Sequence, residues 1–178
     1  FDFLPAPAGG NQLLVFIHGG YWRALSKDDF TWVALPFVNH GIHVALLNYR
    51  LCPEVGIGDI VADCVAGIRA AVALARETAP TLRVVISGHS AGGHLTAMML
   101  CQSATALGLQ PGELRGAVSI SGVMDLAPLI DFSFNSDLKL TAESAAELSP
   151  IHRTPQIAVP LISAVGSDES EEFLRQAS

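Results

Sequence analysis

Short apolar runs alternate with longer helical segments along most of this chain, and this alternation limits the fold more than any other feature. Five apolar runs bounded by turn residues predict strands buried on both faces, at residues 13–17, 42–47, 82–86, 117–120 and 157–165. Regular alternation of strand and helix is the pattern of a mainly parallel sheet with helices on both faces. The sequence therefore predicts an α/β fold that spans residues 1–178 as a single domain.

Three segments between these runs are predicted to be helices. The clearest covers residues 57–79 and is stopped by Pro80. Its apolar face is formed by Ile60, Cys64, Ile68, Ala71 and Ala75. A second candidate covers residues 26–39, where Ser26 and Asp29 resemble a capping box and Pro36 shortens or kinks the helix. The third covers residues 91–107.

Residues 123–150 interrupt the alternation of strands and helices. They hold several Asp and Pro residues and one short helical stretch at residues 142–148. In an α/β sheet such an insertion usually lies above the carboxyl ends of the strands, where it can cover a site. We therefore expect residues 123–150 to cover the functional site, with a plain surface excursion as the alternative.

The most specific motif is Gly-His-Ser-Ala-Gly at residues 88–92, between an apolar run and a helical pattern. G-x-S-x-G in this context predicts a nucleophile elbow. In such an elbow the nucleophile sits on a strained turn, and small flanking residues let the backbone fold tightly around it. The helix N-terminus beneath the turn favours developing negative charge. Ser90 is therefore predicted to be a catalytic nucleophile.

A second glycine motif, His-Gly-Gly-Tyr-Trp at residues 18–22, follows the first apolar run. Glycines at the end of a strand allow backbone N–H groups to point at a substrate oxygen without side chains in the way. Gly19 and Gly20, together with the N–H of Ala91, are predicted to form an oxyanion hole. The alternative is a glycine turn that only closes the strand.

Two adjacent acids, Asp168 and Glu169, follow the last apolar run. An acid at the end of a strand after the nucleophile is where the third member of a catalytic triad belongs, because it holds the base histidine in the correct tautomer. The spacing leaves open which of the two acids serves. The alternative is that both begin the following helix, where acidic side chains suit the helix dipole.

The six histidines all precede these acids, whereas the triad order of this type places the histidine last. His18 and His94 belong to the two glycine motifs and are expected to shape the site by hydrogen bonding. His89 is the variable position of the elbow, and surface or hydrogen-bonded structural roles are expected for the other three, which are His40, His43 and His152.

Composition and spacing argue against several classes of partner. Ten Lys and Arg against 17 Asp and Glu give a net charge of −7, without the basic surface that nucleic acids require. No apolar run reaches the roughly 18 residues of a spanning helix, so we expect no membrane partner. Neither a metal-ligand spacing nor a dinucleotide-binding glycine motif is present, which predicts no metal and no cofactor.

The cysteines point to a reducing compartment. Cys52, Cys64 and Cys101 form an odd set without a C-x-x-C pair, so we expect them to be reduced and buried and the protein to be cytoplasmic. An apolar face could pair two copies as a homodimer, although no segment identifies one.

The motifs together resemble the arylformamidases (kynurenine formamidases), a family of α/β-hydrolases related to the hormone-sensitive-lipase-type esterases. Four stretches carry the resemblance: HGGYW at residues 18–22, NYRLCPEV at 48–55, GHSAGGHL at 88–95 and ESEEFLRQ at 169–176. The esterases usually have a third glycine after HGG, where this chain has Tyr21 and Trp22.

The resemblance implies Ser90 as nucleophile, Gly19, Gly20 and Ala91 as oxyanion donors, and Glu169 rather than Asp168 as the acid. The family usually has Asp at the acid position. Members of the family also begin with further strands and continue with a helix, a strand and the loop that holds the base histidine. We therefore expect this chain to be incomplete at both ends and the base to lie outside it.

The expected function is hydrolysis of a small amide or ester by acyl transfer through Ser90. For an arylformamidase the substrate is N-formylkynurenine, which yields formate and kynurenine. Tyr21 and Trp22 either pack against an aromatic substrate or belong to the core. One alternative is a carboxylesterase of broad specificity that uses the same residues, and another is a catalytically inactive hydrolase fold used for binding.

Overall fold

The α/β prediction is confirmed by the computed structural model, which describes residues 1–7 and 10–177. Across these residues the strands form one six-stranded sheet in the order β1-β3-β2-β4-β5-β6. The strands are β1 (Asp2–Leu4), β2 (Gln12–Ile17), β3 (His43–Leu47), β4 (Arg83–His89), β5 (Leu114–Ile120) and β6 (Leu161–Ala164). All neighbouring strands run parallel except β1, which pairs antiparallel with β3.

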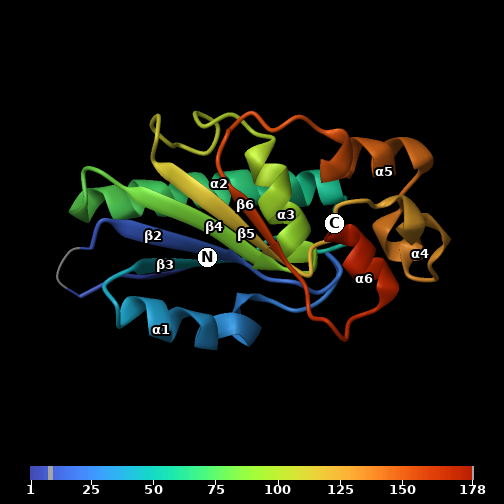
Figure 1. Cartoon of the computed structure of the whole chain (residues 1–178), viewed down its shortest axis with the longest axis horizontal. Coiled ribbons are helices and arrows are strands. Elements are labelled where there is room, and N and C mark those ends of the chain that lie inside the picture. The colour runs from blue at the N-terminus through green and yellow to red at the C-terminus, as the bar shows by residue number, and fades with distance from the viewer. Residues whose placement is uncertain (8–9, 178) are drawn as a thin grey trace.

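Helices cover both faces of the sheet, as predicted. Figure 1 shows α1 (Ala34–Val38) below the sheet and α2 (Ile57–Thr78) and α3 (Ala91–Leu100) above it. The remaining short helices lie toward the carboxyl ends of the strands, with α4, α5 and α6 together at the right of the view (Figure 1). They are η2 (Ala127–Asp131), α4 (Asn135–Leu138), α5 (Ala142–Leu148), η3 (Pro150–His152) and α6 (Glu171–Gln176).

Helix α2 matches the predicted segment to within one residue. The Asp59 side chain accepts the Gly56 N–H at 3.0 Å at its start, and Pro80 follows its end. All members of the predicted apolar face, namely Ile60, Cys64, Ile68, Ala71 and Ala75, are 0% exposed. This face packs against the central strands and makes α2 a main component of the core.

The predicted helix at residues 26–39 is divided in two. The capping box is present, with Ser26 and Asp29 bonded to each other's backbone N–H, but it begins a 3-10 helix, η1 (Lys27–Val33). The α-helix starts only at Ala34. Pro36 then lies in the first turn of α1, where its missing N–H costs no intrahelical hydrogen bond.

The predictions for residues 91–107 and 157–165 are wrong in their extent, and one contact explains both. The backbone N–H groups of Gln156 and Ile157 donate to the carbonyl of Leu100 at 2.8 and 3.2 Å, which ends α3 there. Because residues 156 and 157 are used as a helix cap and Pro160 lacks an N–H, strand pairing begins only at Leu161. Strand β6 is exposed along its length rather than buried, and it forms an edge of the sheet in the described part of the chain.

The register of the parallel strands determines which loops meet at the carboxyl end of the sheet. Ile17 is level with Gly88, His89 with Ile120, and Ile120 with Ala164. The residues that follow these strands therefore lie side by side: Gly19 after β2, Ser90 after β4, Ser121 after β5 and Gly166 after β6.

No helix among residues 1–7 and 10–177 has the length and apolar character to cross a membrane.

Candidate active site

Ser90 lies on the tight turn that joins β4 to α3. Its backbone has φ 56° and ψ −117°, a conformation that residues other than glycine rarely adopt. The Ser90 N–H donates to the carbonyl of Ile120 at 2.8 Å, which ties the turn to the neighbouring strand. Such a strained residue persists only where surrounding contacts fix it, and these positions cluster at active sites.

Glycines allow this turn to approach the end of β2. A Cβ on Gly92 would collide with the carbonyl oxygen of Ile17, and one on Gly19 would lie 2.8 Å from the carbonyl oxygen of His89. The first turn of α3 and the loop after β2 can therefore meet only without side chains at these two positions. This contact brings the two sequence motifs together.

Two of the three predicted oxyanion donors, Gly19 and Ala91, lie beside Ser90, and the third, Gly20, lies in the turn that follows Gly19. Ala91 begins α3, so its N–H is one of the first helical N–H groups that have no acceptor within the helix. Gly19 lies with its Cα beside the Ser90 side chain, since a Cβ there would be 3.2 Å from the Ser90 Cβ. The carbonyl of Gly20 accepts the N–H groups of Arg23 and Ala24, both at 3.0 Å, which closes the turn.

Tyr49 supports this turn, and reasoning from residues alone missed it. Its hydroxyl donates to the carbonyls of His18 at 3.0 Å and Gly19 at 3.4 Å. Its ring stacks on His18 with centroids 4.2 Å apart, while His18 Nδ1 lies 2.7 Å from the Gly19 carbonyl. Burial lowers the pKa of His18, which favours the neutral ring. The NYRLCPEV stretch was the one signal that could have pointed to Tyr49.

Trp22 is fully buried and belongs to the core, while Tyr21 is 38% exposed. The Trp22 indole N–H donates to Nδ1 of His94 at 3.2 Å, so the other ring nitrogen of His94 carries the proton and donates to the carbonyl of Leu148 at 2.8 Å. Burial lowers the pKa of His94 to about 4. One neutral histidine thus links the loop after β2, α3 and the end of α5.

The two candidate acids have different surroundings. One carboxylate oxygen of Glu169 accepts the Ser121 hydroxyl at 2.5 Å and the Gly166 N–H at 3.0 Å. These bonds, the one from Ser121 most of all, lower the pKa of Glu169. The nearby charge of His89, next to Ser90, acts in the same direction. Asp168 is exposed, and it accepts the hydroxyl of the adjacent Ser167 at 3.4 Å.

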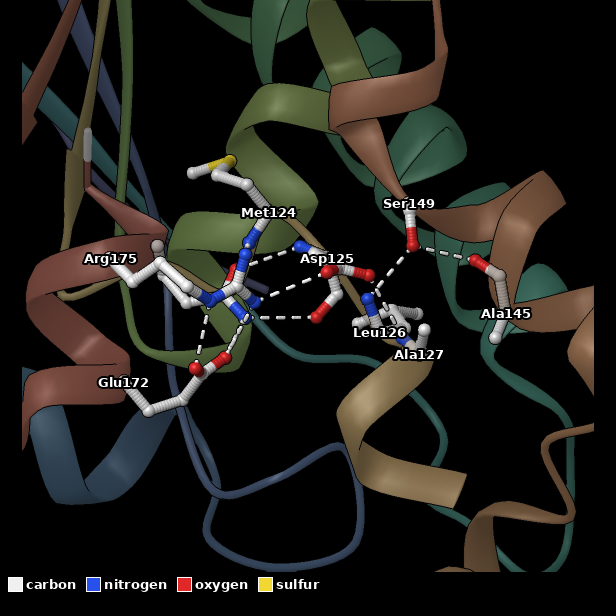
Figure 2. Close-up of polar contacts among 9 residues, drawn as sticks. Met124, Asp125, Leu126, Ala127, Ala145, Ser149, Glu172 and Arg175 are labelled. Carbon is white, nitrogen blue, oxygen red and sulfur yellow. Dashed lines mark hydrogen bonds and ion pairs between the residues drawn. The ribbon is translucent and has the colours of Figure 1, made fainter. Parts of the chain in front are cut away.

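Helix α6, which begins two residues after Glu169, is held against the segment that follows β5. Figure 2 shows the Arg175 guanidinium between two carboxylates, 3.1 Å from Asp125 and 2.7 Å from Glu172. The Gln176 side chain accepts the N–H groups of Met124 and Asp125 at 2.7 and 2.8 Å. These contacts fix where the chain can run between β6 and α6.

An apolar pocket of about 180 Å³ opens between the loop after β2 and α6. Tyr21 lines one side and Phe173 the other, and Phe132, which is 52% exposed, lies at its edge. The Phe134 ring joins the Tyr21 and Phe132 rings, with centroids 5.0 and 5.3 Å away. Phe132 and Phe134 carry no motif and were not predicted.

The segment 123–150 forms η2, α4 and α5 beside these loops (Figure 1). An ion pair of 2.9 Å joins Asp137 of α4 to Arg23 of the loop after β2. Ser149 ties the end of α5 to the start of η2, because its Oγ accepts the Leu126 N–H at 2.8 Å and donates to the Ala145 carbonyl at 2.6 Å (Figure 2).

The histidines do not form a relay with these groups. Within the part of the chain that the structure describes, no hydrogen bond connects a histidine ring to Ser90 or Glu169. His43 is buried and accepts the Ala6 N–H at 3.0 Å, a structural role of the expected kind.

Residues 1–7 and 10–177 contain no group of three or more His, Cys, Asp or Glu that could hold a metal ion. All three cysteines are buried and free.

Known proteins that are similar to this chain show its family. The BD-FAE family model matches residues 3–162. The chain belongs to the BD-FAE family. Among curated relatives, the kynurenine formamidase of Salmo salar is 32% identical over 93% of this chain, and that of Danio rerio is 33% identical over 98%. This BD-FAE chain spans 56% and 60% of the lengths of these two relatives.

A solved structure from Silicibacter sp. TM1040, provisionally described as a thioesterase, is 34% identical with a TM-score of 0.86. It matches 99% of this BD-FAE chain, which covers 65% of it. The predicted α/β-hydrolase fold and the resemblance to arylformamidases and esterases are therefore confirmed.

Proposed function

We propose that this chain carries the nucleophile, the oxyanion hole and the acid of a serine hydrolase that cleaves a small amide or ester. The Ser90 Oγ attacks the substrate carbonyl carbon and gives its proton to the base. The negative charge on the carbonyl oxygen is stabilised by the N–H groups of Gly19, Gly20 and Ala91. The leaving group takes the proton from the base, and water then hydrolyses the acyl-serine to release the acid.

The observation that carries the proposal is the contact between the Ser90 turn and the glycine loop after β2. Ser90 has a positive φ, and a Cβ on Gly19 would lie 3.2 Å from the Ser90 Cβ and only 2.8 Å from the carbonyl oxygen of His89. A strained serine, a helix N-terminus and a glycine turn at one point form the arrangement that acyl transfer needs.

Glu169 is the favoured acid for two reasons. One of its carboxylate oxygens is held by hydrogen bonds, and His89, next to Ser90, helps to lower its pKa. We expect the histidine base in a part of the protein that this chain does not contain. Residues 123–150 are proposed to cover the site, an arrangement supported by the ion pair between Asp137 and Arg23.

N-formylkynurenine is the proposed substrate, with formate and kynurenine as products. The identity of 32–33% to two kynurenine formamidases supports it. The pocket beside Tyr21, of about 180 Å³, has room for an aromatic ring, since an apolar cavity of about 150 Å³ binds benzene. Tyr21 is the exposed aromatic residue of the oxyanion loop and can contact the substrate ring.

A second candidate is an esterase or thioesterase that uses the same residues. It is favoured by the 34% identity to the Silicibacter protein described as a thioesterase. The two candidates share the Ser90 chemistry and differ in the leaving group, which is an arylamine in one case and an alcohol or thiol in the other.

The test is turnover of N-formylkynurenine and p-nitrophenyl acetate by the full-length gene product and its Ser90→Ala variant. The proposal expects loss of both activities in the variant with the fold unchanged by circular dichroism. Retained activity would remove Ser90 from its role. If the wild-type enzyme prefers the acetate by orders of magnitude in kcat/KM, the formamidase assignment is wrong and the esterase assignment stands.

A further inference from the structure

We propose that Ser121 is a positioning residue that fixes the orientation of the Glu169 carboxylate, an inference that rests on the proposed function. Neither the motifs nor the resemblance singled out Ser121. It lies directly after β5, level with Ser90 at the carboxyl end of the neighbouring strand.

Ser121 is held rigidly where it lies. It is 4% exposed, and its N–H donates to the carbonyl of Ala164, the last residue of β6, at 2.7 Å. Its φ of 48° is in the left-handed region, which Gly and Asn adopt at lower cost than Ser. A strained serine at this position indicates that the hydroxyl matters more than the backbone conformation.

The hydroxyl makes a strong hydrogen bond to the acid. A carboxylate can only accept, so Ser121 is the donor, and the distance of 2.5 Å to Glu169 Oε1 is typical of a charge-assisted O–H···O bond. The Gly166 N–H donates to the same oxygen at 3.0 Å. Because both bonds end on Oε1, the other oxygen, Oε2, remains available to accept the N–H of an imidazole.

Gln176 holds the other end of the loop that carries Glu169 between β6 and α6. This side chain is 7% exposed and uses its full amide in hydrogen bonds. Its oxygen accepts the N–H groups of Met124 and Asp125, and its nitrogen donates to the Asp125 carbonyl at 3.0 Å and to Glu172 at 2.7 Å. The segment that follows β5 therefore holds the loop of Glu169 at both ends. Ser121 holds it at the β6 side, and the contacts of Gln176 hold it at the α6 side.

Few charged groups near Glu169 oppose this arrangement of its carboxylate. His89, at the end of β4, favours the charged form of Glu169. Asp168 precedes Glu169 in the chain, and Glu172 of α6 is paired with Arg175 at 2.7 Å. An acid held with one oxygen bonded and one free can keep the base imidazole in its tautomer and stabilise its cation, which is the role of the triad acid.

The experiment compares Ser121→Ala and Ser121→Gly in the full-length gene product, with Ser167→Ala as the matched control. Ser167 lies in the same loop, and its hydroxyl bonds to Asp168 rather than to Glu169. Both Ser121 variants are expected to lower kcat for p-nitrophenyl acetate about tenfold with KM nearly unchanged, the loss expected for one hydrogen bond to a charged group. The control is expected to keep the wild-type kcat.

A purely structural role of Ser121 would give a different pattern. Glycine relieves the strain at φ 48°, so a residue needed only for the turn would leave Ser121→Gly fully active. As a readout independent of turnover, the side-chain carbon resonance of Glu169 should show a higher pKa in both Ser121 variants than in the wild type. An unchanged pKa or an active Ser121→Gly overturns the inference. Activity that survives Ser90→Ala overturns instead the proposed function on which it rests.

Discussion

At the scale of single residues, backbone strain gathers where the chemistry is proposed. Of the six non-glycine residues with positive φ in the described part of the chain, four follow strands at the carboxyl end of the sheet, namely Tyr21, Trp22, Ser90 and Ser121. Strain of this kind persists only where surrounding contacts over-determine it. The close contacts at Gly19 and Gly92 are such constraints, and they make the site a rigid one.

The choice between the two acids can be tested directly. We expect Glu169→Gln to lower kcat by roughly 10³–10⁴-fold, as the loss of a triad carboxylate does. Asp168→Asn, which removes an exposed carboxylate bonded only to its neighbour, is expected to change kcat less than about twofold. The measurement is steady-state hydrolysis of p-nitrophenyl acetate. A larger loss in Asp168→Asn than in Glu169→Gln would reverse the assignment.

His94 should make stability depend on pH. Its pKa is about 4 in the folded protein, against about 6.5 in an unfolded chain. Between these values the unfolded state binds a proton that the folded state does not, so stability falls as pH decreases from 6.5 to 4. The expected loss is about 3 kcal/mol in the free energy of unfolding, from 1.36 kcal/mol per pKa unit.

Urea unfolding at several pH values measures this effect. The His94→Gln variant should lose that part of the pH dependence, whereas His152→Gln, which changes an exposed residue, should keep it. Equal slopes for the wild type and His94→Gln between pH 4 and 6.5 would contradict the neutral, buried His94 described above.

At the scale of elements, short helices depend on a few buried polar side chains. Ser149 is 0% exposed and joins α5 to η2 through the Leu126 N–H and the Ala145 carbonyl (Figure 2). Its removal leaves the buried Leu126 N–H without an acceptor. We expect Ser149→Ala to lower the free energy of unfolding by about 2 kcal/mol.

The matched control is Ser136→Ala, which changes an exposed serine of α4 and is expected to cost less than about 0.5 kcal/mol. Both variants are measured by urea denaturation of the full-length gene product. Equal stability of the two variants would show that Ser149 does not hold α5 in place.

Local signals predicted the elements that local contacts determine. The extent of α2 follows from its apolar repeat and from Pro80, and the agreement is within one residue. The end of α3 and the start of β6 depend on the contact of Gln156 with Leu100, which are far apart in sequence. No local pattern reports such a contact. Strand β1 has only three residues and offers too short a pattern to detect.

At the scale of the whole molecule, one core joins the sheet to α2 and α3. Ile68 of α2 is 0% exposed within this cluster. We expect Ile68→Ala to lower the free energy of unfolding by about 3 kcal/mol, the sum of lost burial and a new cavity. Leu35→Ala, which changes a residue that is 61% exposed on α1, should cost less than about 1 kcal/mol. Thermal unfolding checks both, and equal Tm values for the two variants would contradict the assigned core.

The candidate site was predictable in its centre and less so at its edge. Ser90 and Gly19 stand in motifs whose spacing reflects strand order, and the parallel register brings them together. Tyr49, Ser121 and Phe132 contribute through contacts between segments distant in sequence. A serine or phenylalanine without a motif gives no sign of such a contact until the fold is known.

Covalent labelling with p-nitrophenyl ethyl methylphosphonate tests the central claim most directly, because Ser90 Oγ should attack the phosphorus and displace p-nitrophenolate. Intact mass and peptide mapping of the full-length gene product should find one adduct, on the peptide that contains Ser90, and none in Ser90→Ala. An adduct on another residue, or labelling that persists in Ser90→Ala, would contradict the assignment of Ser90 as the nucleophile.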